Sequence, residues 1–425
     1  MNDWGGRAGK QAPFVIARAA ADLSSLHNGL QFPKKWLFEM NATMRSLFFA
    51  SILALGSFGS ESEAASCEAP VRSETIAVSG HPFAAVATSD GCWMFVSLGK
   101  GNDSGAIGVL KNTDGRYVVD HQVDIGAHAF GEALSRDGRL LVVAMGKDAQ
   151  IFDVSALEQG QAPPMATLHL GRNAGAIYAA ISRDDKLLFV SEEENRRINV
   201  YDLETMRSKE FKNTDPIGYV KTANAPVGLA ISADGRWLYA TNEAGPDRRG
   251  AGSSRCAAEG NGGKPHPEGL LLVVDVQRAA SDPEHALLGG YPSGCNPVRV
   301  ASSPDGKQLF VTARGDNALL RFQMNDWTAA TSDIRMSRYT IGSSPVGVVV
   351  RPDGKQVWVA LSNRFGKDSE GKLAGLADIS TDAPDRLLSA PAPGFPREVT
   401  FLPDGKTLVA TLFDGNQIEI VRTPD

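Results

Sequence analysis

The feature that most constrains the fold is a short turn, in most copies of the form x-x-Asp-Gly, that the chain repeats seven times. Asp-Gly is typical of a tight hairpin, because Gly adopts a positive φ angle at no steric cost. Successive turn Asp residues lie 47 to 51 residues apart, except for one interval of 71. The copies are TSDG at Asp90, SRDG at Asp137, SRDD at Asp184, SADG at Asp234, SPDG at Asp305, RPDG at Asp353 and LPDG at Asp404.

Each turn is flanked by segments of the kind that form β-strands. Runs rich in β-branched and aromatic residues follow the turns, such as KQLFVTA, KQVWVAL and RWLYATN. A third run follows a polar loop, as in INVYDL at 198, LLLVVDV at 270 and LLRFQM at 319, and a fourth, less regular one closes the unit. Four antiparallel strands in about 48 residues are typical of a propeller blade. We therefore predict an all-β fold, a seven-bladed β-propeller of four-stranded antiparallel blades.

The two ends of the repeat region predict how the ring closes. The last copy, REVTFLPDGKTLVATLFDGNQIEIVRT, supplies three strands, and residues 71–80 supply one strand with no blade of their own. We expect this N-terminal strand to complete the last blade, because such pairing removes two exposed sheet edges. Residues 66–425 then form a single propeller domain.

The repeat also resembles a known family. The segments PVGLAISADGRWLYATN (226–242) and NPVRVASSPDGKQLFVTARGDNALLRF (296–322) resemble the YVTN-type repeat of the lactonase-like seven-bladed β-propeller superfamily. The resemblance covers nearly all of residues 70–425. It implies the same fold, but it implies little about function, since such propellers include lactone hydrolases, surface-layer repeats and periplasmic binding proteins.

The first 65 residues are typical of a targeting segment. Residues 44–65, MRSLFFASILALGSFGSESEAA, have the layout of a secretory signal peptide, and their apolar stretch is too short to span a membrane. Residues 1–43 are interpreted as a mis-called start, with Met44 or Met40 the true one, or as an unstructured leader. A lipidated Cys67 is a weaker alternative. We expect an exported protein, periplasmic or secreted, with no membrane span.

The cysteines agree with export, and the net charge bears on whether nucleic acid is a partner. All four cysteines follow the signal segment, and an oxidising compartment predicts two disulfides. Of three connectivities we favour Cys67–Cys92 and Cys256–Cys295, because each pair is closest in sequence. The net charge is −6, and about −7 without residues 1–65. Nucleic acid is therefore not an expected partner, and binding of single-stranded nucleic acid, which occurs within the superfamily, is disfavoured.

Candidate site residues lie in seven four-residue approach segments, each leading into the first strand of a unit. These segments are HPFA at 81, HAFG at 128, GAIY at 175, APVG at 225, NPVR at 296, SPVG at 344 and FPRE at 395. The fourth position begins the innermost strand, where the blades crowd around the propeller axis, and most segments have a small residue there. The exceptions are Tyr178, Arg299 and Glu398, which are large and polar.

These residues support two interpretations. In the first, His81 and His128 activate water and Arg299 stabilises an oxyanion, with Glu398 completing a catalytic ring that opens a lactone. In the second, which we favour, the histidines are loop residues and Arg299 and Glu398 form an ion pair across the channel.

The loops after the second strands add polar groups to the same face. With Tyr178, the expected ligand-binding residues are Glu192, Asn242, Arg314, Asp316 and Asn363. An oxygen-rich set of Glu192–Glu194 with Asn242 and Glu243 suits Ca²⁺ or Mg²⁺, but a solvated acidic rim is the favoured interpretation. We therefore expect no obligatory cofactor.

The one long repeat interval places an insertion on that face, at residues 243–269 of blade four. The insertion is rich in Gly and carries Arg248, Arg249, Arg255 and His266. A disulfide from Cys256 to Cys295 would fix it over the channel mouth as a lid. A shorter loop occupies residues 363–372.

Two functions remain open from the sequence. No GxSxG, HExxH, CxxCH or Walker-type motif occurs in the chain. We favour an exported, monomeric binding scaffold that holds a protein, glycan or small molecule on its loop-rich face. The alternative is a lactone hydrolase or isomerase that uses the His81, His128, Arg299 and Glu398 ring without an obligatory metal.

Overall fold

The computed structural model describes residues 66–424, apart from 102, 162, 247–254, 259–263, 324–326, 328–333, 365–373 and 382–386 and the side chains of 387–389. The leader and the signal segment therefore lie outside the described residues, as do Arg248, Arg249 and most of the shorter loop between the second and third strands of blade six. The described residues all belong to the compact unit that contains the repeats.

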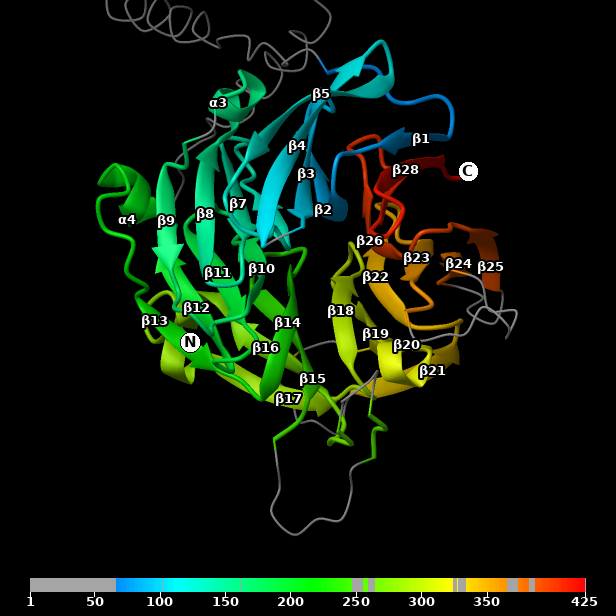
Figure 1. Cartoon of the computed structure of the whole chain (residues 1–425). Helices are drawn as coiled ribbons and strands as arrows, with labels where there is room; N and C mark the ends of the chain where they lie inside the picture. The colour runs from blue at the N-terminus through cyan, green and yellow to red at the C-terminus, as the bar shows by residue number, and fades with distance from the viewer. Residues whose placement is uncertain are drawn as a thin grey trace, which may run out of the picture. The chain divides into compact units, whose positions relative to one another are not determined.

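The repeats form seven four-stranded antiparallel sheets, which confirms the predicted β-propeller. Figure 1 shows the sheets arranged around a centre, with the first strand of each blade innermost. Blades one to four comprise β2 (His81–Ala87), β3 (Trp93–Lys100), β4 (Ser104–Thr113), β5 (Arg116–Asp124); β6 (Glu132–Leu134), β7 (Leu140–Ala144), β8 (Asp148–Asp153), β9 (Ala166–His169); β10 (Ala176–Ile181), β11 (Leu187–Glu192), β12 (Arg197–Asp202), β13 (Gly218–Lys221); and β14 (Asn224–Ile231), β15 (Trp237–Ala244), β16 (Leu270–Asp275), β17 (Leu287–Pro292). Blades five to seven comprise β18 (Pro297–Ser302), β19 (Gln308–Ala313), β20 (Ala318–Gln323), β21 (Arg335–Thr340); β22 (Pro345–Val350), β23 (Gln356–Leu361), β24 (Gly375–Ser380), β25 (Leu387–Pro391); and β26 (Pro396–Phe401), β27 (Thr407–Leu412), β28 (Gln417–Arg422) with β1 (Glu74–Ala77).

The N-terminal strand lies in the last blade. β1 pairs antiparallel with β28, with Glu74 opposite Ile420 and Ala77 opposite Gln417. The sheet order is β1-β28-β27-β26, so one sheet contains strands from both ends of the propeller. The pairing covers the edge of β28 and makes β1 the outer strand of this blade.

The Asp-Gly turns are built from side-chain to backbone hydrogen bonds. In blade five the Ser303 hydroxyl donates to Asp305 Oδ1 at 2.6 Å, and the same oxygen accepts from the backbone N–H of Lys307 at 3.1 Å. Gly306 follows with φ of 70°. Blade three has Asp185 at this position with φ of 57°, a conformation that Asp tolerates better than most residues. The turn carboxylates therefore stabilise the hairpins.

The hydrophobic core lies between neighbouring blades rather than within a blade. One cluster joins blade three to blade four through Phe189, Val200, Leu238 and Val274, which are all fully buried. Full burial of such a side chain contributes about 1.5–3 kcal/mol. Because each strand faces a blade on both sides, the second and third strands are apolar runs rather than alternating ones.

The innermost strands carry a bulge that the second strand supports. In six blades the pairing register shifts near the start of the innermost strand, between Pro82 and Ala85, Ala176 and Tyr178, Pro226 and Leu229, Pro297 and Val300, Pro345 and Val348, and Pro396 and Val399. In blade seven the Thr411 hydroxyl accepts from the backbone N–H of Glu398 at 3.0 Å and donates to the carbonyl of Phe83 in blade one at 3.1 Å. Such hydroxyls link adjacent blades near the channel.

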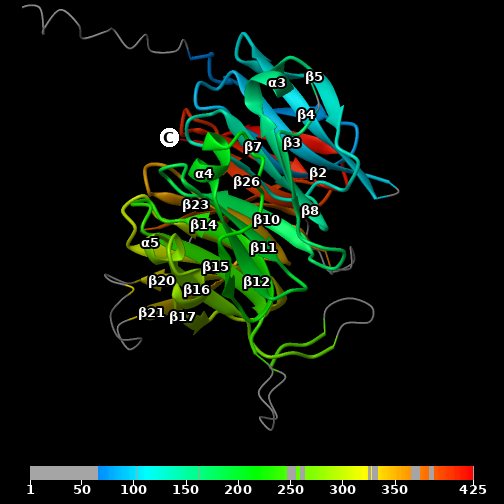
Figure 2. The same ribbon diagram turned by 90° about the vertical axis from the view of Figure 1, so that its left-hand side faces the viewer.

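Short helices connect the third and fourth strands of three blades. They are α3 (Val154–Glu158), α4 (Leu203–Ser208) and α5 (Val276–Ala279), and their N-cap residues Asp153, Asp202 and Asp275 accept a backbone N–H. Figure 2 shows α4 and α5 toward one side of the unit and the insertion of blade four toward the other. None of the helices in the described part of the chain has the length and apolar composition needed to cross a membrane.

Both favoured disulfides are present. Cys67 is bonded to Cys92 and Cys256 to Cys295, with Cα–Cα distances of 5.0 and 5.4 Å. The first joins the segment before β1 to the turn of blade one. The second joins the blade-four insertion to the approach segment of blade five, as expected for a tethered loop. Two disulfides fit an oxidising environment.

Candidate functional site

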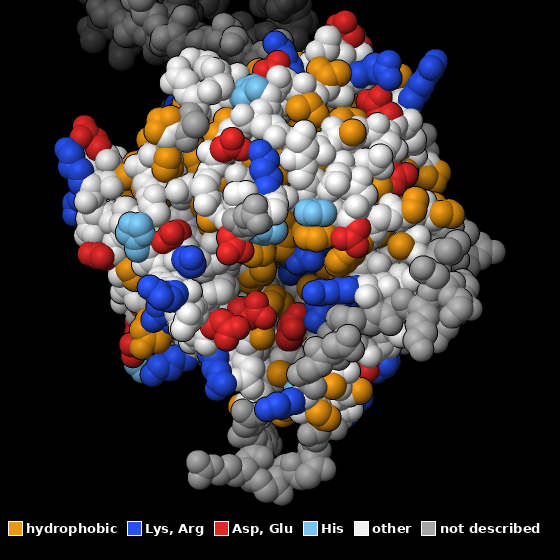
Figure 3. All heavy atoms as spheres, viewed as in Figure 1, with side chains coloured by type: hydrophobic (Ala, Val, Ile, Leu, Met, Phe, Trp, Pro, Cys, Tyr) orange, Lys and Arg blue, Asp and Glu red, His pale blue; other side chains and the backbone are white. Residues whose placement is uncertain are grey.

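A hollow of about 490 Å³ lies at the mouth of the channel, on the face opposite the Asp-Gly turns. Figure 3 shows side chains of both charge signs gathered around this hollow. We call it the mouth pocket. It is lined by Ile177, Glu193, Val227, Glu243, Lys264, His266, Asn296, Val298, Arg299, Arg314, Val346, Arg364, Phe395 and Arg397. Five neighbouring blades, three to seven, therefore contribute to one site.

Beside the mouth pocket, Arg299 and Glu398 form a buried ion pair between blades five and seven. Glu398 Oε1 lies 2.5 Å from both Nε and a terminal nitrogen of Arg299, and both residues are less than a tenth exposed. The Arg299 guanidinium also lies over the ring of Tyr178, 4.5 Å from its centroid. Burial lowers the pKa of Arg299, but the Glu398 carboxylate outweighs it, so the net shift is upward. This is the ion pair that the sequence suggested as an alternative to catalysis.

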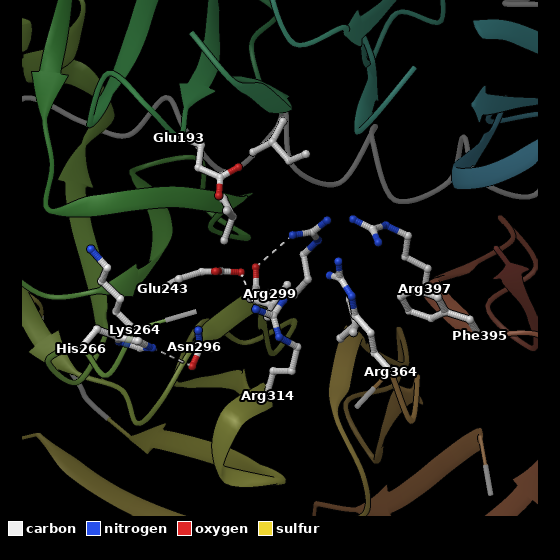
Figure 4. A pocket seen from close by; sticks show the side chains of 14 residues that line it. Glu193, Glu243, Lys264, His266, Asn296, Arg299, Arg314, Arg364, Phe395 and Arg397 are labelled. Carbon is white, nitrogen blue, oxygen red and sulfur yellow. Dashed lines mark hydrogen bonds and ion pairs between the residues drawn. The ribbon is translucent and has the colours of Figure 1, made fainter. Parts of the chain in front are cut away.

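Arg397, next in the chain to Glu398, has no such partner. Its guanidinium lies 3.8 Å from the centroid of the Phe83 ring and 5.4 Å from that of Phe413. Its Nε is buried and makes no hydrogen bond within the described residues. Burial, and then the Arg299 guanidinium, lower the pKa of Arg397 to about 9, so the group keeps its charge at neutral pH. Figure 4 shows Arg397, Arg364 and Arg299 turned toward the same space.

Two carboxylates lie on the other side of the mouth pocket. Glu243 pairs with Arg314 at 3.1 Å, whereas Glu193 has no ion-pair or hydrogen-bond partner among the described residues. Burial, and then the charges of Glu243 and Glu194, raise the pKa of Glu193 to about 7. Glu193 therefore exchanges a proton near neutral pH, which is the property of a general base or acid.

The blade-four insertion supplies the rim of the mouth pocket. His266 Nε2 lies 3.1 Å from Asn296 Oδ1, and the backbone of His266 forms a bridge with Cys256, whose disulfide fixes this part of the loop. Glu268 accepts from the backbone N–H of Gly294 at 2.9 Å and from Arg255 at 2.6 Å. The insertion thus brings His266 and Lys264 to the pocket, in accordance with the prediction that it reaches the mouth.

Of the four proposed catalytic residues, Arg299 lines the mouth pocket. His81 Nδ1 bonds to the carbonyl of Phe413 at 2.9 Å and its ring stacks on that side chain. The His128 ring contacts Phe130 with centroids 4.8 Å apart. Burial, then Arg397 and His81, lower the pKa of His128. Neither imidazole lines the mouth pocket.

Of the expected ligand-binding residues, Arg314 lies in the mouth pocket and Tyr178 lies directly beneath Arg299. Burial raises the pKa of Tyr178 above its usual range. Glu192 is fully buried, and its carboxylate accepts from Asn195, Arg197 and Asn199 of its own blade. Its neighbour Glu193 faces the pocket instead, because side chains alternate along a strand.

Three further expected residues lie outside the mouth pocket. Asn242 is fully buried and donates to the carbonyl of Asn224 at 3.3 Å. Asp316 accepts from the backbone N–H of Cys295 at 2.9 Å and pairs with Arg338 at 3.1 Å. Asn363 lines a neighbouring hollow between blades six and seven.

Arg397 escaped prediction because it occupies the third position of its approach segment rather than the fourth. The third positions are Phe83, Phe130, Ile177, Val227, Val298, Val346 and Arg397. Six of them are apolar, and five of the seven side chains line the mouth pocket. A charged residue in an otherwise apolar series was therefore a signal that the sequence contained.

A second charged residue in an otherwise apolar series lies two positions after the third position of the approach segments. The residues there are Ala85, Glu132, Ala179, Leu229, Val300, Val348 and Val399. Glu132 is 4% exposed, and although the backbone amides of Ser97 and Val86 approach its carboxyl group, neither oxygen makes a hydrogen bond of normal geometry. Burial raises the pKa of Glu132 well above its usual value and so disfavours its ionised form.

The acidic residues near the mouth bear on whether a cation could bind there. In the described part of the chain, no three His, Cys, Asp or Glu side chains converge as metal ligands do. Glu192, the first residue of the predicted oxygen-rich set, is occupied by Arg197. The carboxylate of Glu243 is paired with Arg314.

Known proteins share the fold over most of the chain. The family model described as "Lactonase, 7-bladed beta-propeller" matches residues 99–248. Kuenenia stuttgartiensis hydrazine synthase is 16% identical with a TM-score of 0.61, covering 85% of this chain and 98% of its own. The β-propeller domain of Myceliophteria thermophila Cps50 (Swd1) is 13% identical with a TM-score of 0.57, covering 83% and 98%. No curated protein matches the sequence.

The family match ends before the approach segments of blades five to seven. It contains Tyr178, Glu193 and Glu243 but excludes Arg299 and Arg397. At this level of identity the two solved structures show a common fold and nothing about a ligand. The seven four-stranded blades and the match over residues 99–248 together make the chain a seven-bladed β-propeller similar to the lactonase family.

Proposed function

We propose that the protein is an exported binding protein that holds a small anionic molecule in the mouth pocket. One observation supports this function above all others, namely the Arg397 guanidinium, which is partly buried, charged and without a carboxylate partner among the described residues. A charge that is partly withdrawn from water and has no partner is costly to the fold. A bound carboxylate or phosphate would supply the missing partner through charge-assisted hydrogen bonds.

The dimensions of the mouth pocket favour a small molecule over a protein or glycan. A volume of about 490 Å³ lies within the usual range of small-molecule sites, roughly 300–1,000 Å³. Its walls combine apolar groups from the innermost strands with charged groups, which is the usual composition of such sites. Arg364 and Lys264 add positive charge at the rim.

Export is part of the proposal. Its support is the pair of disulfides, which are stable in an oxidising compartment, together with the signal-peptide pattern of residues 44–65. Periplasmic fractionation of cells that produce the tagged protein tests this part directly. Recovery of the protein in the cytoplasm with reduced cysteines would contradict it.

Calorimetric titration tests the binding function. The purified protein is titrated at low salt with butyrate and with inorganic phosphate, and so are the variants Arg397→Gln and Arg422→Gln. Arg422 is a matched control, because it lies in the same blade but pairs with Asp404. We expect Arg397→Gln to weaken binding by about tenfold or more, since it removes a charge-assisted contact, and Arg422→Gln to leave binding unchanged. Equal affinities for wild type and Arg397→Gln, or no binding by the wild type, would refute the proposal.

Lactone hydrolysis is a second candidate function. Its general base would be Glu193 rather than His81 or His128. Glu193 is a carboxylate with a pKa of about 7 in the same pocket as Arg397. It would remove a proton from water as the water oxygen adds to the lactone carbonyl, while Arg397 stabilises the oxyanion. The ring C–O bond then breaks, and the ring oxygen takes the proton to give a hydroxy acid.

A small lactone panel separates the two functions. If the protein is a hydrolase, the rate should rise with pH around 7 as Glu193 loses its proton, and Glu193→Gln should abolish the rise. The double variant His81→Ala, His128→Ala should retain most of the rate, because neither residue lines the pocket. Rates equal to the spontaneous reaction would exclude this candidate and leave the binding function.

A further inference from the structure

The mouth pocket contains two charges of opposite sign, Arg397 and Glu193, that have no ion-pair partner among the described residues. Arg397 comes from the innermost strand of blade seven, and Glu193 follows the second strand of blade three. Figure 4 shows both side chains directed into the pocket from different walls. Their charges influence each other, yet no ion pair within 4 Å joins them.

Other charged groups in the pocket do not supply the missing partners. The Glu398 carboxylate is held by Arg299, and the Glu243 carboxylate is held by Arg314. Arg397 packs on the aromatic rings of Phe83 and Phe413, and no carboxylate pairs with its guanidinium in the part of the chain that the structure describes. Glu193 and Arg397 belong to different sheets, and in the structure no ion pair joins them.

Apolar side chains line the pocket together with these charges. They are contributed by the third positions of the intervening approach segments, Ile177, Val227, Val298 and Val346. These surfaces suit carbon chain rather than a second polar group. The complementary ligand therefore has an anionic end, a cationic end and an apolar part.

We infer that the mouth pocket recognises a zwitterion of the amino-acid class, with its carboxylate on Arg397 and its ammonium group on Glu193. This inference rests on the proposed anion-binding function and names its ligand class. A ligand of this kind would pair both orphan charges at once. An anion alone would satisfy Arg397 and leave Glu193 unpaired.

The inference requires Glu193 to be ionised when the ligand is bound. The charged groups that face Glu193 are Glu243 and Glu194, which disfavour its ionised form, and Arg314 and Arg397, which favour it. An ammonium group would add to the favourable side. Affinity for a zwitterion should therefore rise between pH 6 and pH 8, whereas affinity for butyrate should not rise.

The experiment compares ligands that share a carbon skeleton. The purified protein is titrated with butyrate, butylamine and the series glycine, β-alanine, 4-aminobutyrate and 5-aminovalerate, at pH 6 and pH 8. We expect the best amino acid at pH 8 to bind about tenfold tighter than butyrate, as one added charge-assisted contact gives. Butylamine should bind more weakly than either.

Two variants assign the cationic end. Glu193→Gln should bind butyrate at least as well as the wild type and lose the tenfold preference for the amino acid. Glu204→Gln, a matched charge removal in the same blade, should keep that preference, because Glu204 pairs with Lys186 away from the pocket. A preference that survives in Glu193→Gln would overturn the assignment.

The controls also separate this inference from the proposed function. Butyrate binding as tightly as every amino acid would refute the zwitterion and leave the anion site intact. If neither butyrate nor phosphate binds, and Arg397→Gln binds amino acids as the wild type does, both are refuted.

Discussion

The turn face and the mouth face of this propeller use charge in opposite ways. At the turns, carboxylates such as Asp305 accept from a Ser hydroxyl and from backbone N–H groups. Those hydrogen bonds lower the pKa of Asp305. At the mouth, burial and like charges lower the pKa of Arg397 and raise that of Glu193. Charge stabilises the fold on one face and opposes it on the other.

The difference teaches where function is to be sought in a repeat fold. All seven turns have a carboxylate at the same position, so its presence there follows from hairpin formation. Arg397 and Glu132 each depart from a series that is otherwise apolar. A departure that costs stability needs a reason other than folding. Variants on both faces test whether the two kinds of charge differ in this way.

The largest effect is expected at the buried ion pair of Arg299 and Glu398. Glu398→Ala should lower the free energy of unfolding by about 3–5 kcal/mol, because Arg299 would remain buried without its carboxylate. Urea unfolding of the purified protein measures this loss. The double variant Arg299→Leu, Glu398→Leu should recover most of it. A loss below about 1 kcal/mol would place Arg299 with the unpaired charges instead.

Replacing the buried carboxyl group of Glu132 should stabilise the protein. Glu132→Val gives blade two the kind of residue found in the other six and should add about 2–3 kcal/mol at pH 8. The pKa of Glu132 is raised in the folded state, so its folded form is fully stable below the unfolded pKa and loses stability as pH rises toward the folded pKa. The gain should therefore be larger at pH 8 than at pH 4.

Thermal unfolding of wild type and Glu132→Val at both pH values checks this prediction, with Glu132→Gln as an isosteric control. A gain that is the same at pH 4 and pH 8 would mean that the carboxyl group does not titrate differently in the two states. A loss at both would mean that Glu132 has a structural partner.

A smaller gain is expected when the unpaired guanidinium is removed. Arg397→Met should raise stability by about 1 kcal/mol, because it removes a partly buried charge while keeping contact with the ring of Phe83. Chemical denaturation measures the gain in the absence of ligand. Added butyrate should stabilise the wild type and not the variant. A destabilised variant would mean that Arg397 serves the fold, as the turn carboxylates do.

The smallest effect is expected at a single turn. Asp305→Ala should lower stability by about 1 kcal/mol, the usual contribution of such hydrogen bonds, and should not change ligand affinity. Because the pKa of Asp305 is lowered, its contribution is present above the unfolded value of about 3.8 and is lost as pH falls through the folded pKa. Unfolding at pH 7 and pH 3 should therefore show a difference between the variant and the wild type only at the higher pH.

The sequence by itself determined the repeat and its consequences. The spacing of the turns, the apolar runs beside them and the one long interval predicted seven blades and the place of the insertion. The two disulfides were correctly favoured by proximity in sequence. These features are local, or repeat at a fixed period, so a single chain displays them without knowledge of its packing.

Tertiary structure alone decided which polar residues meet. Glu192 and Glu193 are neighbours, yet the first is bound inside its blade and the second faces the pocket. The bulge in the innermost strand of blade seven places Glu398 against Arg299 and Arg397 toward the mouth. Arg299 and Glu398 lie 99 residues apart, and only the closure of the ring brings them within 2.5 Å. The repeat fixes each residue within its blade, but contacts across the channel depend on the twist and spacing of whole sheets, which no local pattern encodes.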